Sequence, residues 1–453
     1  MSLKISSLFD FNYSLIKGGE LILQKGSLYF AEVRLLMGTL KREAVASLQP
    51  VFYWIFDQRF DFLLEMFVSY LKRHGLEAKP IQILSYNAKN AAWKIVPLGV
   101  GANKEDFRVN EPSDVNRYFE EFIADTGSYS ENLVVVASFT GENLRKHSNT
   151  VHLTSVSPQA DLLNNKLSQY ELMRKHNYPH VQQMVCKDLY CLKENHDALQ
   201  KRFCSYVIKF PDCSGGYLMS HIKNQDDLDQ FIMEYGCYVQ DKVVLVSGYQ
   251  KHIMSVSGFG CVYENGDVHY FGASEQILYD EYKYAGLVYP AFLSEKQTIL
   301  IKDETMRAGQ LLREEGYHGF FNVDLLMLED GCLLPVEINA RFGFSLLLFG
   351  CLYQNQCFDV LLDGKECTPI QTKERIVICK LKGTFGVSIG DVPSSGDLIS
   401  FYNGDVDYFE EIYCRNANYA YGSFIGIGGL RFEVNEAREV VLSRAIELYL
   451  KYV

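Results

Sequence analysis

The stretch GFFNVDLLMLEDGCLLPVEINARFG, residues 319–343, decides the fold. Apolar side chains alternate along its first half, from Phe321 to Leu326. A turn follows at Glu329-Asp330-Gly331, and a second apolar run leads back from Leu333 to Ile338. Alternation, a tight Asp-Gly turn and a returning apolar run predict a β-hairpin.

Polar side chains interrupt the two predicted strands at few points. Folding back at the turn brings Asp324 roughly opposite Glu337, and Asn339 leaves the same strand face as Glu337 because the two are two residues apart. A solvated sheet face would explain one carboxylate, but Asp324, Glu337, Asn339 and Arg341 together on apolar strands favour a functional site. Three converging oxygen donors predict a Mg²⁺ site that carries substrate phosphates.

A second set of candidates precedes the hairpin. The run Tyr206-Val207-Ile208 reads as a strand that ends at Lys209, which would be a fixed positive charge against phosphates. Ser214-Gly215-Gly216 permits a turn whose backbone N–H groups can approach a phosphate, since glycine has no Cβ in the way.

Composition sets the class of protein. The 453 residues allow two to four domains, with 48% apolar and 22% charged residues and a net charge of −12. No Lys/Arg block is present, which argues against a nucleic-acid surface, and no apolar run is long enough to span a membrane. The twelve cysteines, without a signal-type N-terminus, indicate reduced thiols in a cytoplasmic protein.

These motifs resemble the ATP-grasp superfamily, whose metal-binding hairpin ends in Glu-x-Asn-x-Arg, here Glu337-Ile338-Asn339-Ala340-Arg341. The resemblance implies that Lys166 and Lys209 contact the nucleotide phosphates and that Ser214, Gly215 and Gly216 form the flexible loop over them. It also implies that Tyr238, Val239, Gln240 and Asp241 form the strand that holds adenine. The chain departs from the family pattern at Tyr217 and Leu218, and at Phe344, where glycines are common.

The implied fold is α/β, with an α+β ATP-grasp core. Residues 1–157 would form an N-terminal Rossmann-like pre-ATP-grasp domain, because strands predicted at Val51–Phe56, Pro80–Leu84 and Leu133–Ser138 alternate with helical patterns. Residues 158–350 would form the core, with a lid lobe at about 184–245 and an amphipathic helix from Asp303 to Glu315 that leads into the hairpin. Residues 351–453 would form a small closing domain.

The implied activity is that of an ADP-forming carboxylate–amine ligase that works through an acyl phosphate. ATP and Mg²⁺, with Mn²⁺ as an alternative metal, would be its cofactors, and a small carboxylate and an amine its substrates. Arg341 and Lys209 would be its catalytic residues. Two other functions stay open: an ATP-grasp carboxylase or phosphotransferase, and an inactive ATP-binding protein. A homodimer is compatible with the sequence, which does not decide it.

Overall fold

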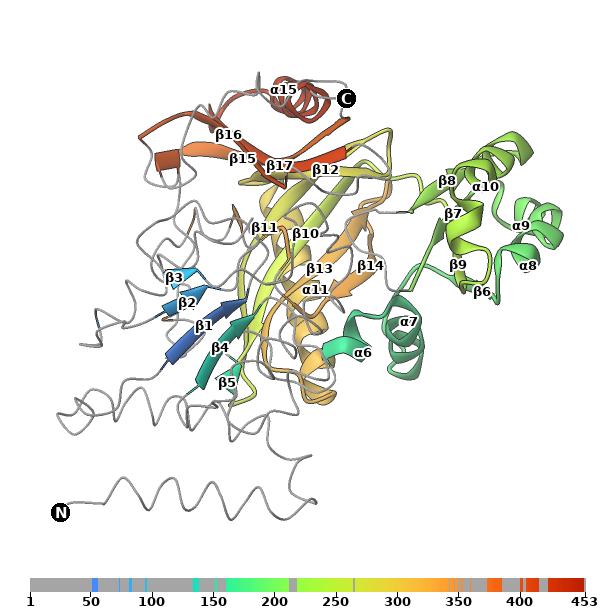
Figure 1. Cartoon of the computed structure of the whole chain (residues 1–453), viewed down its shortest axis with the longest axis horizontal. Coiled ribbons are helices and arrows are strands. Elements are labelled where there is room, and N and C mark those ends of the chain that lie inside the picture. The colour runs from blue at the N-terminus through green and yellow to red at the C-terminus, as the bar shows by residue number, and fades with distance from the viewer. Residues whose placement is uncertain are drawn as a thin grey trace, which may run out of the picture.

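The computed structural model describes the central part of the chain almost continuously, over residues 160–211, 218–263, 265–341 and 343–345 (Figure 1). On the N-terminal side it describes mainly five strands, and on the C-terminal side mainly residues 373–384, 405–414 and 423–451. The loop that contains Ser214, Gly215 and Gly216 lies outside the described residues, so its predicted phosphate contacts stay a prediction.

The N-terminal strands form a five-stranded parallel sheet in the order β3-β2-β1-β4-β5. The strands predicted from the apolar runs are present as β1, β2 and β4. Parallel strands are usually buried on both faces, which is consistent with the continuous apolar runs of β1 and β4. The strand bounds are Val51–Ile55 (β1), Ile81–Ile83 (β2), Lys94–Ile95 (β3), Leu133–Ala137 (β4) and Val151–His152 (β5).

The central sheet has eight strands, all paired antiparallel, in the order β14-β13-β10-β11-β12-β15-β17-β16. The predicted hairpin is its β13–β14 edge. The strands are Met254–Val262 (β10), Val268–Tyr279 (β11), Lys283–Tyr289 (β12), Gly319–Met327 (β13), Leu333–Asn339 (β14), Glu374–Thr384 (β15), Tyr408–Cys414 (β16) and Ser423–Glu433 (β17).

Helix α11, Glu295–Glu314, packs along this sheet and begins eight residues before the predicted start at Asp303. The reason is a capping box, in which the Ser294 hydroxyl accepts from the N–H of Gln297 and the side-chain oxygen of Gln297 accepts from the N–H of Ser294. The helix comes so close to β10 that a Cβ on Gly258 would lie 1.9 Å from the Thr305 hydroxyl oxygen.

The C-terminal strands extend the central sheet through the pairing of β12 with β15. Helix α15, Arg438–Leu450, covers this end of the sheet (Figure 1). Its residues Val441, Ala445 and Leu448 share one apolar core with Val288 of β12 and Val377 of β15. The strands of the segment predicted as a closing domain therefore continue the central sheet.

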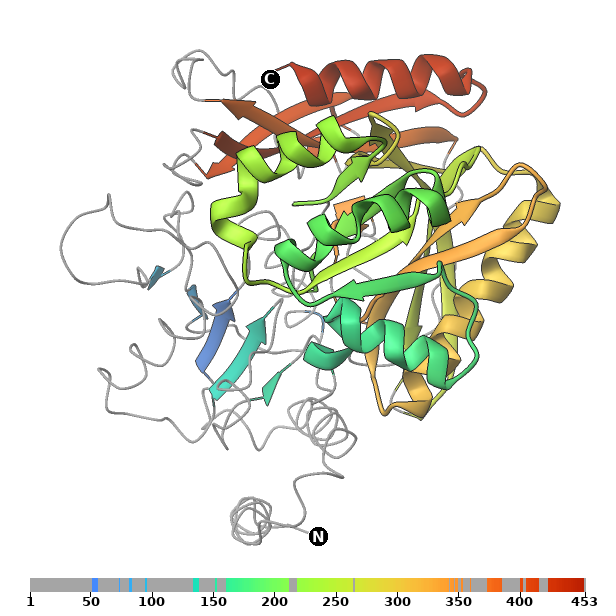
Figure 2. The same cartoon turned by 90° about the vertical axis from the view of Figure 1, so that its right-hand side faces the viewer.

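A smaller unit projects from the central sheet (Figures 1 and 2). It is a four-stranded antiparallel sheet in the order β6-β9-β7-β8, with its own apolar core built around Tyr206, Ile208 and Val246. Its elements are Gln183–Cys186 (β6), Leu189–Glu194 (α8), His196–Phe203 (α9), Tyr206–Lys209 (β7), Ser220–Ile222 (β8), Gln225–Val239 (α10) and Val244–Gly248 (β9). Its position in the chain is that of the predicted lid lobe.

The strand predicted at Tyr238 to Asp241 is wrong. Tyr238 and Val239 form the last turn of α10, Gln240 is its C-cap, and the next strand, β9, begins only at Val244. The helix continues because Leu228, Phe231 and Val239 lie on its buried face, so packing overrides the strand preference of Tyr and Val.

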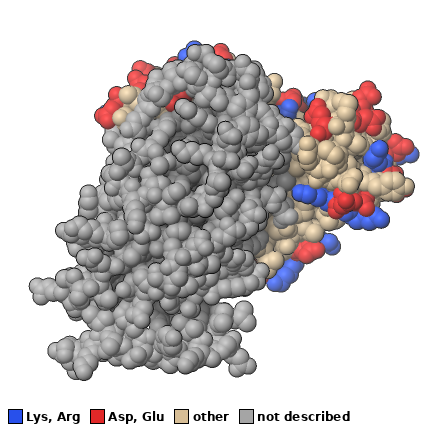
Figure 3. Space-filling model, in the orientation of Figure 1, with Lys and Arg blue, Asp and Glu red and all other residues tan. Residues whose placement is uncertain are grey.

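Charge and helix length can be stated for the described residues. Lys and Arg side chains alternate with Asp and Glu on the projecting unit, without a patch of one sign, on the face seen in Figure 3. Within the described residues, every helix is too short or too polar to cross a bilayer.

Candidate nucleotide and metal site

The hairpin β13–β14 brings its polar residues onto one face, as predicted. Asp324 pairs with Glu337 and Asn322 pairs with Asn339 in the strand register. The tight turn at Gly331, with a φ of +82°, allows this register, because only glycine adopts such a φ freely. All four side chains line the same cavity.

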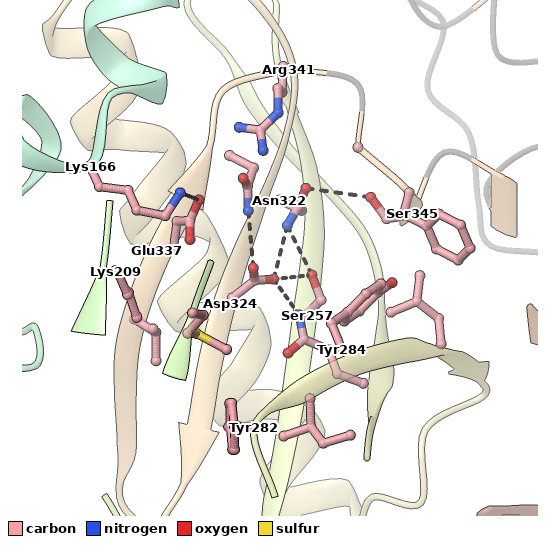
Figure 4. Close-up of a pocket in the computed structure, with 18 of the residues that line it drawn as sticks. Lys166, Lys209, Ser257, Tyr282, Tyr284, Asn322, Asp324, Glu337, Arg341 and Ser345 are labelled. Atoms are coloured by element: carbon pink, nitrogen blue, oxygen red, sulfur yellow. Dashed lines mark hydrogen bonds and ion pairs between the residues drawn. The ribbon is translucent and has the colours of Figure 1, made fainter. Parts of the chain in front are cut away.

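Asp324 is the centre of a buried hydrogen-bond network (Figure 4). Its Oδ1 accepts from the Ser257 hydroxyl at 2.8 Å, from Gln276 Nε2 at 2.8 Å and from Asn322 Nδ2 at 3.0 Å. Its Oδ2 accepts from Asn339 Nδ2 at 3.1 Å. Ser257 comes from β10, Gln276 from β11 and Asn339 from β14, so three other strands help to fix this carboxylate of β13.

The two acidic residues of the site differ in their electrostatic surroundings. Burial, together with the nearby charge of Glu337, raises the pKa of Asp324 to about 6. Burial also disfavours the charge of Glu337, but Lys166, Arg341 and Lys209 outweigh it and hold the pKa of Glu337 below its usual value. Glu337 is therefore ionised at neutral pH, whereas Asp324 carries a charge that the surrounding groups compensate less well.

Lys166 is held against Glu337 by the start of a helix. Its Nζ lies 3.2 Å from Glu337 Oε1. Helix α7, Lys166–Lys175, begins at this residue because the side chain of Asn165 caps the N–H groups of Leu167 and Ser168 at 3.1 Å. The short helix α6, Ala160–Asn164, precedes it.

Gln169 joins α7 to strand β14. Its Nε2 donates to the carbonyl oxygens of Leu163 and Ile338, and its Oε1 accepts from the N–H of Ile338 at 2.9 Å. Gln169 is only 5% exposed, so these bonds are shielded from water. The position of Lys166 relative to Glu337 thus depends on a side chain outside the site.

Lys209 reaches the cavity from the projecting unit. It ends β7, whose residues Tyr206, Val207 and Ile208 are buried, so the strand fixes its stem. Burial lowers the pKa of Lys209, and the nearby charge of Lys166 lowers it further, although Glu337 opposes both. An added anion at this place would relieve the repulsion between the two lysines.

Arg341 follows β14 at the other end of the site. One of its guanidinium nitrogens donates to Asn164 Oδ1 at 2.6 Å, and Asn164 Nδ2 in turn donates to the carbonyl oxygen of Ala340 at 3.0 Å. Burial lowers the pKa of Arg341, but the ordinary value is so high that the group keeps its charge.

Several of the predicted site residues line one cavity of about 190 Å³. Six of them line it together, namely Lys166, Lys209, Asp324, Glu337, Asn339 and Arg341. The sequence interpretation assigned no role in the site to Ser257, Gln276 or Asn322. Asn322 interrupts the same apolar strand as Asp324, and this was a usable signal. Tyr238, Val239, Gln240 and Asp241 are not among the described residues that line this cavity.

The chemistry of this donor set fits a divalent cation. Asp324 and Glu337 supply two carboxylates and Asn339 an amide oxygen, and the raised pKa of Asp324 marks a position where positive charge would be stabilising. Among the described residues, no three His, Cys, Asp or Glu side chains cluster closely enough to hold a metal by themselves. Such a sparse set of carboxylates is typical of Mg²⁺ that is shared with phosphates.

Residues 163–345 match the model of the ATP-grasp domain. The chain therefore contains an ATP-grasp domain, as the Glu-x-Asn-x-Arg motif implied. The matched residues begin just before Lys166 and end just after Arg341, so they contain the whole hydrogen-bonded cluster around Asp324.

One relative in sequence is similar to part of this chain. The chain is 28% identical over 196 residues to a [butirosin acyl-carrier protein]–L-glutamate ligase of Niallia circulans, a match that covers 42% of this chain and 46% of that ligase. The chain thus spans about half the length of this relative.

Among solved structures, an N5-carboxyaminoimidazole ribonucleotide synthase from Aspergillus clavatus, complexed with ATP, matches with a TM-score of 0.59 at 14% identity. That likeness covers 89% of this chain and 99% of the other. A biotin carboxylase from Campylobacter jejuni also matches with a TM-score of 0.59, at 12% identity, over 85% of this chain and 87% of the other. These likenesses show the fold.

Proposed function

We propose that the chain is an ATP-dependent, ADP-forming ligase that activates a small carboxylate as an acyl phosphate and joins it to an amine. The observation that carries the proposal is the arrangement of Lys166, Lys209 and Arg341 around Asp324 and Glu337 in one cavity. Three cations beside two carboxylates suit a site that brings a triphosphate and a carboxylate, both anionic, within bonding distance.

Each residue has a defined task in this reaction. Lys166 and Lys209 would offset the charge of the phosphates, and Arg341 would hold the substrate carboxylate by two-point contact. Asp324, Glu337 and Asn339 would hold Mg²⁺, which supplies further charge neutralisation when bound. A carboxylate oxygen attacks the γ-phosphorus and ADP leaves; the amine then attacks the acyl carbon, phosphate leaves, and the amine loses a proton.

The surrounding parts of the chain would serve this site. The unit of β6 to β9 would act as the lid that excludes water from the acyl phosphate, since Lys209 belongs to it. The five-stranded parallel sheet supports our proposal that residues 1–157 form a Rossmann-like domain before the ATP-grasp core. The cytoplasmic location, the adenine-binding residues and a homodimer remain predictions from the sequence.

Trapping with hydroxylamine tests this function. The protein is incubated with ATP, Mg²⁺, hydroxylamine and a panel of carboxylic acids, and both ADP and hydroxamate are measured. The panel includes L-glutamate, with and without an acyl-carrier protein, because both occur in the name of the Niallia circulans relative. We expect ADP and hydroxamate in equal amounts with at least one acid. Release of AMP, or release of ADP that no acid stimulates, would contradict the proposal.

A further inference from the structure

The candidate cavity has two unlike sides. Figure 4 shows Lys166 and Lys209 on one side of Asp324 and Tyr284 and Ser345 on the other. Three further apolar residues that line the cavity belong with Tyr284: its pairing partner Leu278, Leu287 of the same strand, and Phe344, whose ring meets that of Tyr284. We call these four side chains the apolar wall.

An irregularity in strand pairing creates the apolar wall. Gln276 pairs with Leu287 and Leu278 pairs with Tyr284, but the register shifts between these pairs, so that Ala285 has no partner on β11. Such a bulge turns Tyr284 and Leu287, which are three residues apart, to the same face of β12. Without the shift, one of the two would point to the opposite face.

Phe344 closes the apolar wall from the segment after β14. Its ring meets the ring of Tyr284 edge-on, with 5.7 Å between the centroids and 86° between the planes. Burial, and then the nearby charge of Asp324, raises the pKa of Tyr284, so its phenol stays neutral. The side chains of the wall are uncharged and lie beside a charged site. The ammonium of Lys380 lies 5.9 Å from the centre of the Tyr284 ring, but Lys380 is not among the described residues that line the cavity.

The polar groups next to the wall are already used within the protein. Gln276 donates to Asp324 through Nε2 and accepts from the Ser255 hydroxyl at 2.6 Å through Oε1. Among the described residues that line the cavity, the cations are Lys166, Lys209 and Arg341. If the two lysines serve the phosphates, Arg341 serves one carboxylate, and the described lining offers no cation for a second.

We propose that the acid substrate is a monocarboxylate with an apolar or aromatic body, whose carboxylate meets Arg341 and whose body lies on the apolar wall. This inference rests on the proposed ligase function and specifies its substrate class. A second carboxylate on the substrate would lose its hydration against Tyr284 and Phe344 without gaining a charged partner among the described lining residues.

Matched pairs of acids test the proposal on the wild-type protein. ADP and hydroxamate formation with 3-phenylpropanoate and hexanoate are compared with glutarate, adipate and L-glutamate. We expect kcat/KM to be at least about tenfold higher for the monocarboxylates. Equal or better use of a dicarboxylate or of L-glutamate would overturn the substrate class while leaving the ligase function intact. ADP formation that no acid stimulates would overturn the ligase function, and the substrate class with it.

Substitution of Phe344 locates the binding surface. Phe344→Leu, the matched control that keeps the wall apolar, is expected to raise the KM for the monocarboxylate about threefold to tenfold and to leave the KM for ATP unchanged. Phe344→Arg is expected to reverse the preference, so that adipate is used better than hexanoate. A change in the KM for ATP alone, or an unchanged preference in a folded Phe344→Arg variant, would contradict the proposed wall. The wild-type comparison stands if the variant fails to fold.

Discussion

At the scale of single residues, the site depends on the difference between its two carboxylates. Glu337 faces three cations, whereas Asp324 receives hydrogen bonds from neutral groups of four strands. Neutral donors compensate a buried charge less than an ion pair does. Asp324 therefore carries an electrostatic cost in the metal-free protein that a bound cation would relieve.

This cost predicts a pH dependence of stability. A carboxyl group whose pKa rises to about 6 on folding destabilises the native state as pH rises from about 4 to about 7, because the unfolded chain loses the proton more readily. The full effect is about 3 kcal/mol. In chelator-treated protein, denaturant titrations between about pH 5 and pH 7.5 should show the free energy of unfolding of Asp324→Asn rising relative to wild type by about half that amount. A difference that stays constant with pH would contradict the assignment.

The charge of Glu337 should be needed for turnover. Glu337→Gln keeps the shape but removes the partner of Lys166 and one carboxylate of the metal site. We expect ADP formation to fall by about a hundredfold or more, as for the loss of other preorganised charges, while the fold stays intact by circular dichroism. Glu329→Gln, on the exposed turn of the same hairpin, is the control and should retain activity. Ordinary turnover by Glu337→Gln would remove it from the metal site.

Lys209 should contribute mainly to nucleotide binding. Lys209→Ala removes a charge that burial already disfavours and that phosphate would stabilise. We expect the Kd for ATP to rise about tenfold to a hundredfold, measured by calorimetric titration. Lys187→Ala, an exposed lysine of the same unit, should leave the Kd unchanged. Unchanged affinity in Lys209→Ala would exclude this lysine from the phosphate site.

At this scale the sequence was sufficient to predict which polar residues of the hairpin lie close together. Asp324, Glu337 and Asn339 were identified because the hairpin turn fixes which residues face each other. Ser257 and Gln276 were missed because their strands, β10 and β11, come next to Asp324 only through the pairing of β10 with β13, which is distant from both in the sequence. Long-range register, which local pattern does not carry, determines that they reach Asp324.

At the scale of elements, the attachment of α7 to β14 positions Lys166. The side-chain amide of Gln169 makes this attachment through hydrogen bonds to backbone groups of Ile338 and Leu163. Gln169→Ala would leave buried N–H and C=O groups without partners, so we expect the free energy of unfolding to fall by about 2–4 kcal/mol. Denaturant titration measures the loss. Gln230→Ala on the exposed face of α10 should change it by less than about 0.5 kcal/mol. Equal effects of the two substitutions would contradict the proposal that Gln169 attaches α7 to β14.

Elements with clear local signals were predicted well, and those that tertiary packing decides were not. The hairpin and the strands β1, β4 and β7 follow from apolar runs bounded by turn residues. Helix α10 runs on through Tyr238 and Val239 because its buried face continues, although these residue types favour strands in isolation.

At the scale of the whole molecule, three apolar cores divide the described chain. One lies between α11 and the central sheet, one inside the projecting unit, and one beneath α15. The projecting unit has its own apolar core, as the proposed role of this unit as a lid over the β13–β14 hairpin requires. The sheet connects β12, which ends at Tyr289, to β15, which begins at Glu374, and no local pattern in the sequence reveals a pairing over that separation.

The most direct test of the account is the dependence of nucleotide binding on both the metal and the hairpin. A non-hydrolysable ATP analogue is titrated into wild-type protein and Glu337→Gln, each with Mg²⁺ and with chelator. We expect Mg²⁺ to tighten binding to the wild type by at least about tenfold and to have little effect on the variant. Binding that is equally tight in all four titrations, or no binding at all, would contradict the claim that Asp324, Glu337 and Asn339 hold a metal–nucleotide complex.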